Sequence, residues 1–380
     1  MRTSFYVVFA LVMIHVDVGR TQDFSRMTVR NVRSLGMGGA AVAVAGEDNI
    51  LFYNPALLTT LRYPRLNFVD VSVRLNTNAL DQYQFYRDHR EEFNNIARLN
   101  NTELNDLYRQ ALDAAQQQAI INVEGPAPIH FLSRHFGAGI FSAGNAVYEM
   151  FEGATGIPII DTRLRGDVQI MASLAHTFAA GPRGRAGDFS VGVTGKYLNR
   201  WITRKSKTIS GFTNNESLYF YRGRSFSFDL GAFYTLNRRF QFGAAVYDIF
   251  STSFSWNAKG ATLDNPVPPN KISTSYRLGM VYRPGIRLQK WFYNFALALD
   301  FDEPFTGGNS FFKTVYMGGE FNLTPLLMLR GGFSQGYPAL GAGLNLYVLR
   351  ADYAFYGEEM GKFAGQLASW NHALRVQVGF

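Results

Sequence analysis

The sequence predicts an all-β fold, an antiparallel transmembrane β-barrel of about fourteen strands. Three observations lead to this prediction. Apolar and polar residues alternate over successive stretches of about ten residues, which is the length and period of a strand that crosses a membrane. The connections between these stretches are mostly short and long in turn, and the last stretch, Asn371–Phe380, ends on an aromatic residue.

The composition suits strands and turns. Aromatic residues make up 15% of the chain and charged residues only 17%, below the roughly 25% of an average soluble domain. The absence of cysteine excludes disulfides, thiolate metal sites and a cysteine nucleophile. The net charge of +8 comes from Lys and Arg scattered through strands and loops, so we expect no nucleic-acid partner.

The first residues predict a secretory signal peptide over residues 1–22. Arg2 supplies the positive region, and Phe5–Ile14 is an apolar stretch too short to span a bilayer. We expect cleavage between Gly19 and Gln22, and the alternative is a buried N-terminal strand or helix. No later stretch approaches the ~20 apolar residues of a transmembrane helix. An exported chain of this kind is periplasmic, secreted or a barrel in the bacterial outer membrane.

Residues 226–236 illustrate the alternation. Even-numbered positions from Phe226 to Leu236 are apolar and the opposite face is mostly small or polar, with Phe233 as the exception. The chain contains an even number of such stretches, as single-chain bacterial barrels require. The predicted strands are Leu66–Asn76, Gln118–Ser133, Phe136–Val147, Asp167–Ala180, Asp188–Trp201, Arg224–Leu236, Arg239–Phe250, Ile272–Pro284, Lys290–Asp302, Lys313–Leu323, Pro325–Gln335, Pro338–Leu346, Val348–Gly357 and Asn371–Phe380.

The second predicted strand contains Pro126 and Pro128. A proline has no amide hydrogen to donate to a neighbouring strand, so we expect a bulge or an edge there.

Connection lengths favour a membrane barrel over a soluble β-protein, because barrels have short turns at the periplasmic end and longer loops outside. Connections after even-numbered predicted strands are short: Arg134-His135, Gly181–Gly187, Asn237-Arg238, Gly285–Gln289, Thr324 and Tyr347. Those after odd-numbered strands are longer, apart from Gly336-Tyr337: Thr77–Gln117, Tyr148–Gly166, Ile202–Gly223, Ser251–Lys271, Glu303–Phe312 and Glu358–Trp370.

The final strand has a further feature, the apolar pattern of its last residues. Leu374, Val376, Val378 and Phe380 lie on one face of it, and the chain stops at the aromatic. This pattern resembles the signal that the outer-membrane barrel assembly machinery recognises. We therefore expect that machinery and outer-membrane lipid as partners.

One long connection has helical spacing. Residues Leu80–Gln118 are polar, with Asn101 or Thr102 as a plausible N-cap. Apolar residues recur after it at the helical period, at Leu104, Leu107, Tyr108, Ala111, Leu112 and Ala115. We expect residues 77–117 to form a helical extracellular loop.

The segment before the first strand carries a family resemblance. Residues 34–49 read Ser-Leu-Gly-Met-Gly-Gly-Ala-Ala-Val-Ala-Val-Ala-Gly-Glu-Asp-Asn, and Phe52-Tyr-Asn-Pro-Ala56 follows. This order resembles the N-terminal signature of FadL-like outer-membrane barrels, the long-chain fatty-acid transporter type. It is also similar to their PorV-type relatives, which are associated with protein secretion. Leu57 stands where fatty-acid transporters usually have Gly, which favours the relatives.

The resemblance implies a fourteen-stranded barrel over residues 66–380 with residues 23–65 folded into the lumen as a hatch. Gly36, Gly38 and Gly39 would permit close turns of the hatch. Asn54, Pro55 and Ala56 would lie near the wall where the chain enters the first strand, although Asn-Pro-Ala alone fits an ordinary turn. Phe52 and Tyr53 would line a hydrophobic pocket beside the hatch.

No motif nominates catalysis or a cofactor. Gly36-x-Gly38-x-x-Ala41 fits the dinucleotide pattern, but no strand precedes it and no βαβ unit surrounds it. The six histidines include no pair at metal-ligand spacing, so we expect no metal. No nucleophile elbow, phosphate-loop lysine motif or zinc-protease motif occurs, so we expect no enzyme. The acidic residues Asp300, Asp302 and Glu303 are interpreted as a solvated rim, with weak cation binding as the alternative.

Two functions fit these predictions. The first is a plugged conduit, a porin-like barrel that passes hydrophobic solutes such as long-chain fatty acids. The second is a PorV-like anchor or component of a secretion or surface-attachment system, with a secretion-system protein as partner and no solute transport. A soluble exported β-protein is the third and weakest reading.

Overall fold

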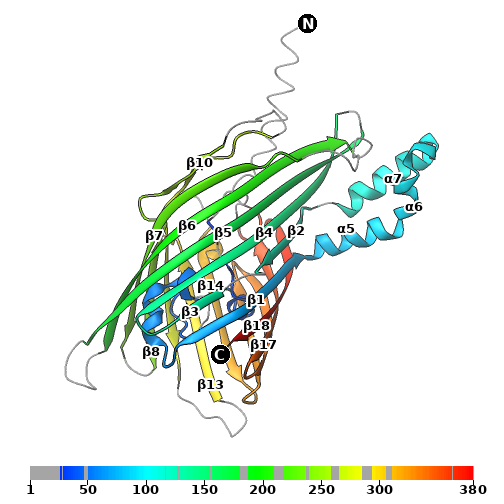
Figure 1. Cartoon of the computed structure of the whole chain (residues 1–380). Helices are drawn as coiled ribbons and strands as arrows, with labels where there is room; N and C mark the ends of the chain where they lie inside the picture. Colours follow the sequence, from blue (N-terminus) through cyan, green and yellow to red (C-terminus); the bar gives the residue numbers. More distant parts are fainter. Residues whose placement is uncertain are drawn as a thin grey trace.

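Each predicted strand pairs with its neighbours along the chain in the computed structural model (Figure 1). The structure describes residues 26–379, except for residues 28, 47–49, 116, 126–128, 155, 180–186, 209–217, 237–238, 258–264, 285–292, 305–309 and 362. The predicted signal peptide and Phe380 lie outside the described residues.

The wall is one antiparallel sheet closed on itself, because the first strand pairs with the last from Asn67↔Gly379 to Asn76↔Asn371. In the described residues it has fourteen strand positions, as the sequence predicts. The strands are β1 (Arg65–Asn76), β2 (Ala119–Glu124), β3 (Ile129–Leu132), β4 (Phe136–Glu152), β5 (Pro158–Ala179), β6 (Asp188–Thr208), β7 (Tyr221–Thr235), β8 (Phe240–Tyr247), β12 (Ser275–Tyr282), β13 (Tyr293–Asp302), β14 (Val315–Asn322), β15 (Leu327–Ser334), β16 (Tyr337–Leu346), β17 (Leu349–Glu359) and β18 (Ala368–Gly379).

Strands β2 and β3 share the second position, between β1 and β4. Gly125 follows β2 with a φ of 92°, a left-handed conformation that favours glycine. The strand is therefore interrupted where the two prolines interrupt its pattern. Pro126 and Pro128 themselves lie outside the described residues.

The outer face of the wall is apolar. Phe226, Phe228 and Leu230 on β7 are 58%, 43% and 49% exposed, while Ser225, Ser227 and Asp229 between them are buried. The last strand follows the same rule, with Leu374 and Val376 outward and Arg375 inward. An exposed apolar band with a polar interior is the pattern of a barrel whose wall lies in lipid.

The inner face carries paired charges. Arg200 on β6 binds Asp167 on β5 through two hydrogen bonds of 2.7 and 2.9 Å, and Arg375 on β18 binds Asp70 on β1 at 2.6 Å. Charges can be buried there because each has a partner, since an unpaired buried charge is strongly destabilising.

Two predicted loops are wrong. Tyr148–Gly166 is largely strand, because β5 runs for 22 residues. The first part of Ile202–Gly223, up to Thr208, belongs to β6, which runs for 21 residues. A membrane needs only about 9–11 residues per strand, so these hairpins extend well beyond it. Ladder pairing continues there without apolar alternation, and ion pairs such as Arg204 with Asp161 at 2.8 Å join the extended strands.

The first long connection is helical, with α5 (Thr77–Asp88), α6 (Arg90–Asn94), η2 (Ile96–Arg98) and α7 (Asn101–Ala114). Figure 1 shows these helices projecting beyond the end of β1. Helix α7 is capped by Asn100, one residue before the predicted positions, because Glu103 completes a reciprocal capping box with it. Among the described helices, none is long and apolar enough to cross a membrane. That this connection is extracellular stays a prediction.

The remaining short elements are β9 (Thr252–Ser253), β10 (Ser255–Trp256), β11 (Lys271–Ile272) and η4 (Phe311–Thr314). β9 pairs with β11, and β10 extends the sheet at β7. Together, β9 to β11 form a small covering structure in the connection between β8 and β12.

Candidate functional site

The barrel interior is occupied by the chain's own N-terminal part. We call the described residues 29–46 and 50–61 the lumenal segment; it contains α3 (Val32–Gly36), α4 (Ile50–Tyr53) and η1 (Pro55–Thr60). Its residues are almost all buried, and its apolar side chains join the inner face of the wall in continuous clusters. Small residues dominate from Gly36 to Ala43, which lets the backbone approach the wall closely.

The segment approaches the wall closely at inward-facing glycines of two runs of neighbouring strands, β6 to β8 and β14 to β16. We call these residues the glycine belt: Gly192, Gly231, Gly243, Gly318, Gly332 and Gly341. A Cβ atom at any of them would collide with the lumenal segment. It would lie 2.5 Å from the Ala56 nitrogen at Gly192, 2.8 Å from the Pro55 Cδ at Gly231, 2.8 Å from the Gly38 nitrogen at Gly332 and 2.8 Å from the Gly36 Cα at Gly341. Real Cβ contacts are longer, so only glycine fits.

The motif residues of the sequence therefore meet the belt. Gly36, Gly38, Pro55 and Ala56 each face a belt glycine, as described above. Gly38 and Gly39 have φ values of 66° and 87°, which side chains disfavour. Gly39 lies against the ring of Tyr316, where a Cβ would be 2.8 Å from Cδ1.

Asn54 joins the lumenal segment to itself and to the wall. Its side-chain amide donates to the carbonyl oxygens of Val42 at 3.0 Å and Ala232 on β7 at 2.9 Å. Its Oδ1 accepts from the Ala56 nitrogen at 3.0 Å and so caps η1. Asn54 is fully buried, and these bonds satisfy both ends of its side chain.

An ion pair of the wall holds the turn at residues 39–42. Asp300 on β13 accepts from the backbone nitrogens of Ala41 at 2.7 Å and Val42 at 2.9 Å. Its partner Arg277 on β12, with Nε 3.3 Å from Oδ2, donates to the Gly39 carbonyl at 2.8 Å. The turn is therefore bound through both its donors and its acceptor.

The interpretation of the acidic cluster as a solvated rim or weak cation site is thus wrong for Asp300, which is fully buried. Its strand points it into the lumen, where the two backbone N–H groups and Arg277 all approach the same oxygen, Oδ2. Asp302 and Glu303 are only half-buried. Burial, followed by the nearby Asp302 carboxylate, raises the pKa of Glu303, which lies just beyond the strand. Within the described part of the chain, His, Asp and Glu form no group placed to hold a metal ion.

A second anchor begins at α3. Arg33 makes a bidentate pair with Glu320 on β14, at 2.8 and 2.7 Å. Glu320 also accepts from Arg330 on β15 at 2.7 Å, and Arg330 in turn binds Asp352 on β17 at 2.7 Å. The network ties the lumenal segment to three strands of the wall.

Phe52 and Tyr53 pack inside the barrel. Phe52 meets Phe141 on β4 edge to face, with ring centroids 4.7 Å apart. Tyr53 accepts a hydrogen bond from the Asn31 nitrogen at its hydroxyl, at 2.8 Å, and one from Tyr247 at its carbonyl, at 2.6 Å. Neither residue lines the groove described below, so their pocket role stays a proposal.

The sequence did not predict which residues of the wall bind the lumenal segment, namely Asp300, Arg277, Glu320 and the glycine belt. Two features could have revealed it. Arg33 directly precedes a segment of small and apolar residues that is expected inside the barrel, where its charge requires a buried partner. Glycines also recur on the inward face of one strand after another, as Gly231, Gly243 and Gly279 do.

The sequence profile of a family described as "F plasmid transfer operon, TraF, protein" matches residues 51–302. No curated protein sequence matches the chain.

Solved structures with a similar fold include the toluene transporter TbuX of Ralstonia pickettii, with 12% identity, a TM-score of 0.46 and coverage of 91% of this chain and 97% of that one. For the toluene transporter TodX of Pseudomonas putida the values are 10%, 0.47, 93% and 98%. For a FadL homologue of Pseudomonas aeruginosa they are 11%, 0.43, 94% and 99%. With scores this low, the barrel assignment rests on the strand pairing of this chain.

Gly332→Ala should loosen the lumenal segment. The added methyl would meet Gly38 and the wall, and overpacking of this kind costs roughly 1–3 kcal/mol. Hydrogen exchange of residues 36–44, measured by mass spectrometry, should accelerate by about tenfold for each 1.4 kcal/mol lost. The matched control is Gly331→Ala on the same strand, where a Cβ would face outward with its nearest neighbour 3.9 Å away. Equal effects of the two changes on hydrogen exchange would contradict the close contact between the glycine belt and the lumenal segment.

Asp300→Asn should destabilise the barrel by about 3–5 kcal/mol, because it leaves the buried Arg277 guanidinium without its counter-charge. Urea unfolding in lipid vesicles measures the free energy of unfolding. Exchange of the Ala41 and Val42 amides should also accelerate. Asp302→Asn, two residues away and half-buried, should cost less than about 1 kcal/mol. A loss no larger at Asp300 than at Asp302 would contradict the anchor.

Proposed function

The chain belongs to the family described as the TraF protein of the F plasmid transfer operon, and we propose that it is an outer-membrane conduit for small hydrophobic solutes. The apolar outer face of its barrel suits a membrane, and the lumenal segment would close the barrel as a hatch. The proposed role is passage without catalysis. Export by the predicted signal peptide and assembly through the C-terminal residues Leu374, Val376, Val378 and Phe380 belong to the same proposal.

One observation carries this proposal. The largest apolar cluster of the described residues, which we call the apolar column, extends from the lumenal segment at Phe52 and Leu57 to Phe254 and Ile272 of the covering structure, with half-buried Trp256 packed against it. Phe254 and Trp256 are stacked, with ring centroids 5.2 Å apart. An apolar solute would meet aromatic and aliphatic groups along this column, whereas paired charges line much of the remaining lumen.

The column is packed in the structure, so passage requires the lumenal segment to shift. Phe52 and Tyr53 would then line the opened path, in keeping with the role expected from the sequence. The cluster suits apolar molecules in general, and long-chain fatty acids are the finer form of the proposal. Small hydrophobic molecules are thus the proposed partners.

A specific observation supports a second function, that of a PorV-like anchor or component of a secretion system. The helices α5 to α7 and the extended hairpins of β4 to β7 offer a large surface beyond the membrane. Exposed aromatic residues occur on it, including Tyr83, Tyr86 and Phe151. The family description also names a transfer operon, which is in keeping with a role in a protein assembly.

Uptake by protein-containing liposomes tests the conduit. We expect entry of toluene and of oleate above that of protein-free liposomes. Phe254→Ser should reduce the rate about tenfold, because a hydroxyl buried in the column costs roughly 1–3 kcal/mol. Phe250→Ser, at a neighbouring residue that is 91% exposed, should leave uptake unchanged. Heat modifiability on gels verifies that both variants are folded.

Uptake of oleate alone would support the fatty-acid form of the proposal. Uptake of neither solute, together with protein crosslinks from α5 to α7 in intact cells, would overturn the conduit in favour of the anchor.

A further inference from the structure

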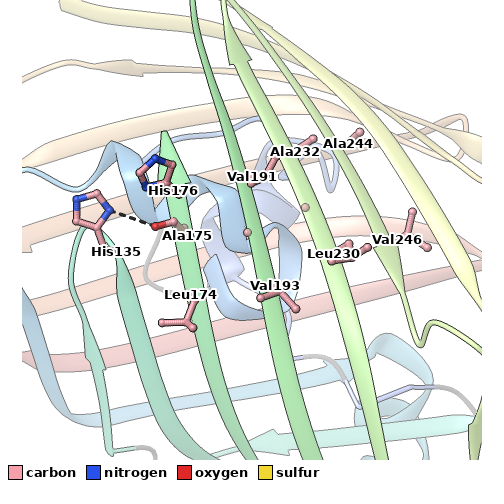
Figure 2. A pocket seen from close by; sticks show the side chains of 12 residues that line it. His135, Leu174, Ala175, His176, Val191, Val193, Leu230, Ala232, Ala244 and Val246 are labelled. Atoms are coloured by element: carbon pink, nitrogen blue, oxygen red, sulfur yellow. Dashed lines mark hydrogen bonds between the residues drawn. The ribbon is translucent and has the colours of Figure 1, made fainter. Parts of the chain in front are cut away.

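A groove of about 660 Å³ crosses strands β5 to β8, within the usual range for small-molecule sites. Its sides include Leu174, Val193, Leu230 and Val246, one from each strand. Figure 2 shows these side chains on adjacent strands, with His135 and His176 together at one end.

The groove opens toward lipid and away from the lumen. Leu174 and Leu230 are 61% and 49% exposed, whereas their neighbours in sequence Ser173, Ala175 and Asp229 are buried toward the interior. The groove is therefore continuous with the apolar band that faces the membrane. Its occupant is a component of the membrane or a protein embedded in it.

The floor of the groove is formed by residues with little or no side chain. Gly192 and Gly231 line it, and Ala232 and Ala244 add one methyl group each. The two glycines belong to the glycine belt, so on their inner side they contact Ala56 and Pro55 of the lumenal segment. The wall is only one backbone thick here, and the packed segment behind it supports the floor.

One end of the groove is polar and lies at the short turn between β3 and β4. Arg134 and His135 are exposed in this turn. The His135 Nδ1 lies 3.1 Å from the Ala175 carbonyl, and the His176 ring is 6.4 Å from the His135 ring. Arg134, next to the lining residue His135 in this turn, supplies a permanent positive charge, and His176 supplies an N–H group at the same end of the groove. The phosphate of a lipid would complement both groups.

We propose that this groove binds a phospholipid, with one acyl chain along the floor between β5 and β8 and the phosphate at Arg134 and His176. The apolar lining suits an acyl chain, and the positive charge at one end complements the phosphate. A second copy of the protein would need no such charge at the end of an apolar groove. The site lies outside the lumen, so lipid binding there can be tested independently of solute passage.

Photocrosslinking tests the site. The full chain is reconstituted in phosphatidylethanolamine vesicles that contain phosphatidylglycerol with a diazirine on its acyl chain, and labelled peptides are mapped by mass spectrometry. We expect label to concentrate on β5 to β8, several-fold above the outward face of β14 to β16. Ala244→Trp fills the floor and should lower labelling to that background, while Ala342→Trp, on the outward face of β16, should leave it unchanged.

A second probe separates headgroup from chain. Diacylglycerol with the same diazirine should label the groove less than phosphatidylglycerol does, and Arg134→Gln should remove this difference without affecting folding, because Arg134 is an exposed turn residue. Uniform labelling around the barrel would overturn the proposal. So would equal labelling by the two probes, or replacement of lipid label by crosslinks between two copies of the chain.

Discussion

The contact on which the structure depends is the approach of one backbone to another inside the barrel. At the glycine belt the lumenal segment touches the wall with no side chain between them, as at Gly341 and Gly36. A larger residue at either would push the segment away from the wall. This closeness brings Asp300 within reach of the Ala41 and Val42 amides. It also leaves a thin wall at Gly192, which becomes the floor of the outer groove.

Apolar packing buries the lumenal segment, and buried ion pairs fix its position in the barrel. Arg33, Arg277 and Asp300 each bond to a defined partner across the interface between segment and wall. Such pairs add little net stability, since desolvation offsets their attraction, but losing one partner is costly. They therefore favour one position of the segment over others of similar packing. The apolar column beside Phe52 joins the segment to the wall by packing of apolar side chains, and the conduit proposal requires movement along this side.

The wall was predictable because lipid imposes a strict period of two, as on Phe226–Leu236, where one face must be apolar. Beyond the membrane that requirement ends. The ladder through Tyr148–Gly166 consequently shows no alternation, although its hydrogen bonds continue. The lumenal motif was visible at Gly36 and Asn54, but its partners were not. Asp300 lies 259 residues from Ala41 in the chain, and no local pattern records that contact.

Ionic conductance in a planar bilayer tests the central claim, that the lumenal segment fills the barrel. Because the lumenal segment packs the lumen and is anchored to the wall, the reconstituted protein should show no steady conductance steps at any moderate voltage. Denaturant that releases the segment before the wall should produce them. Stable open-pore steps from the untreated protein would contradict a packed lumen, and with it the roles assigned here to the glycine belt and its anchoring ion pairs.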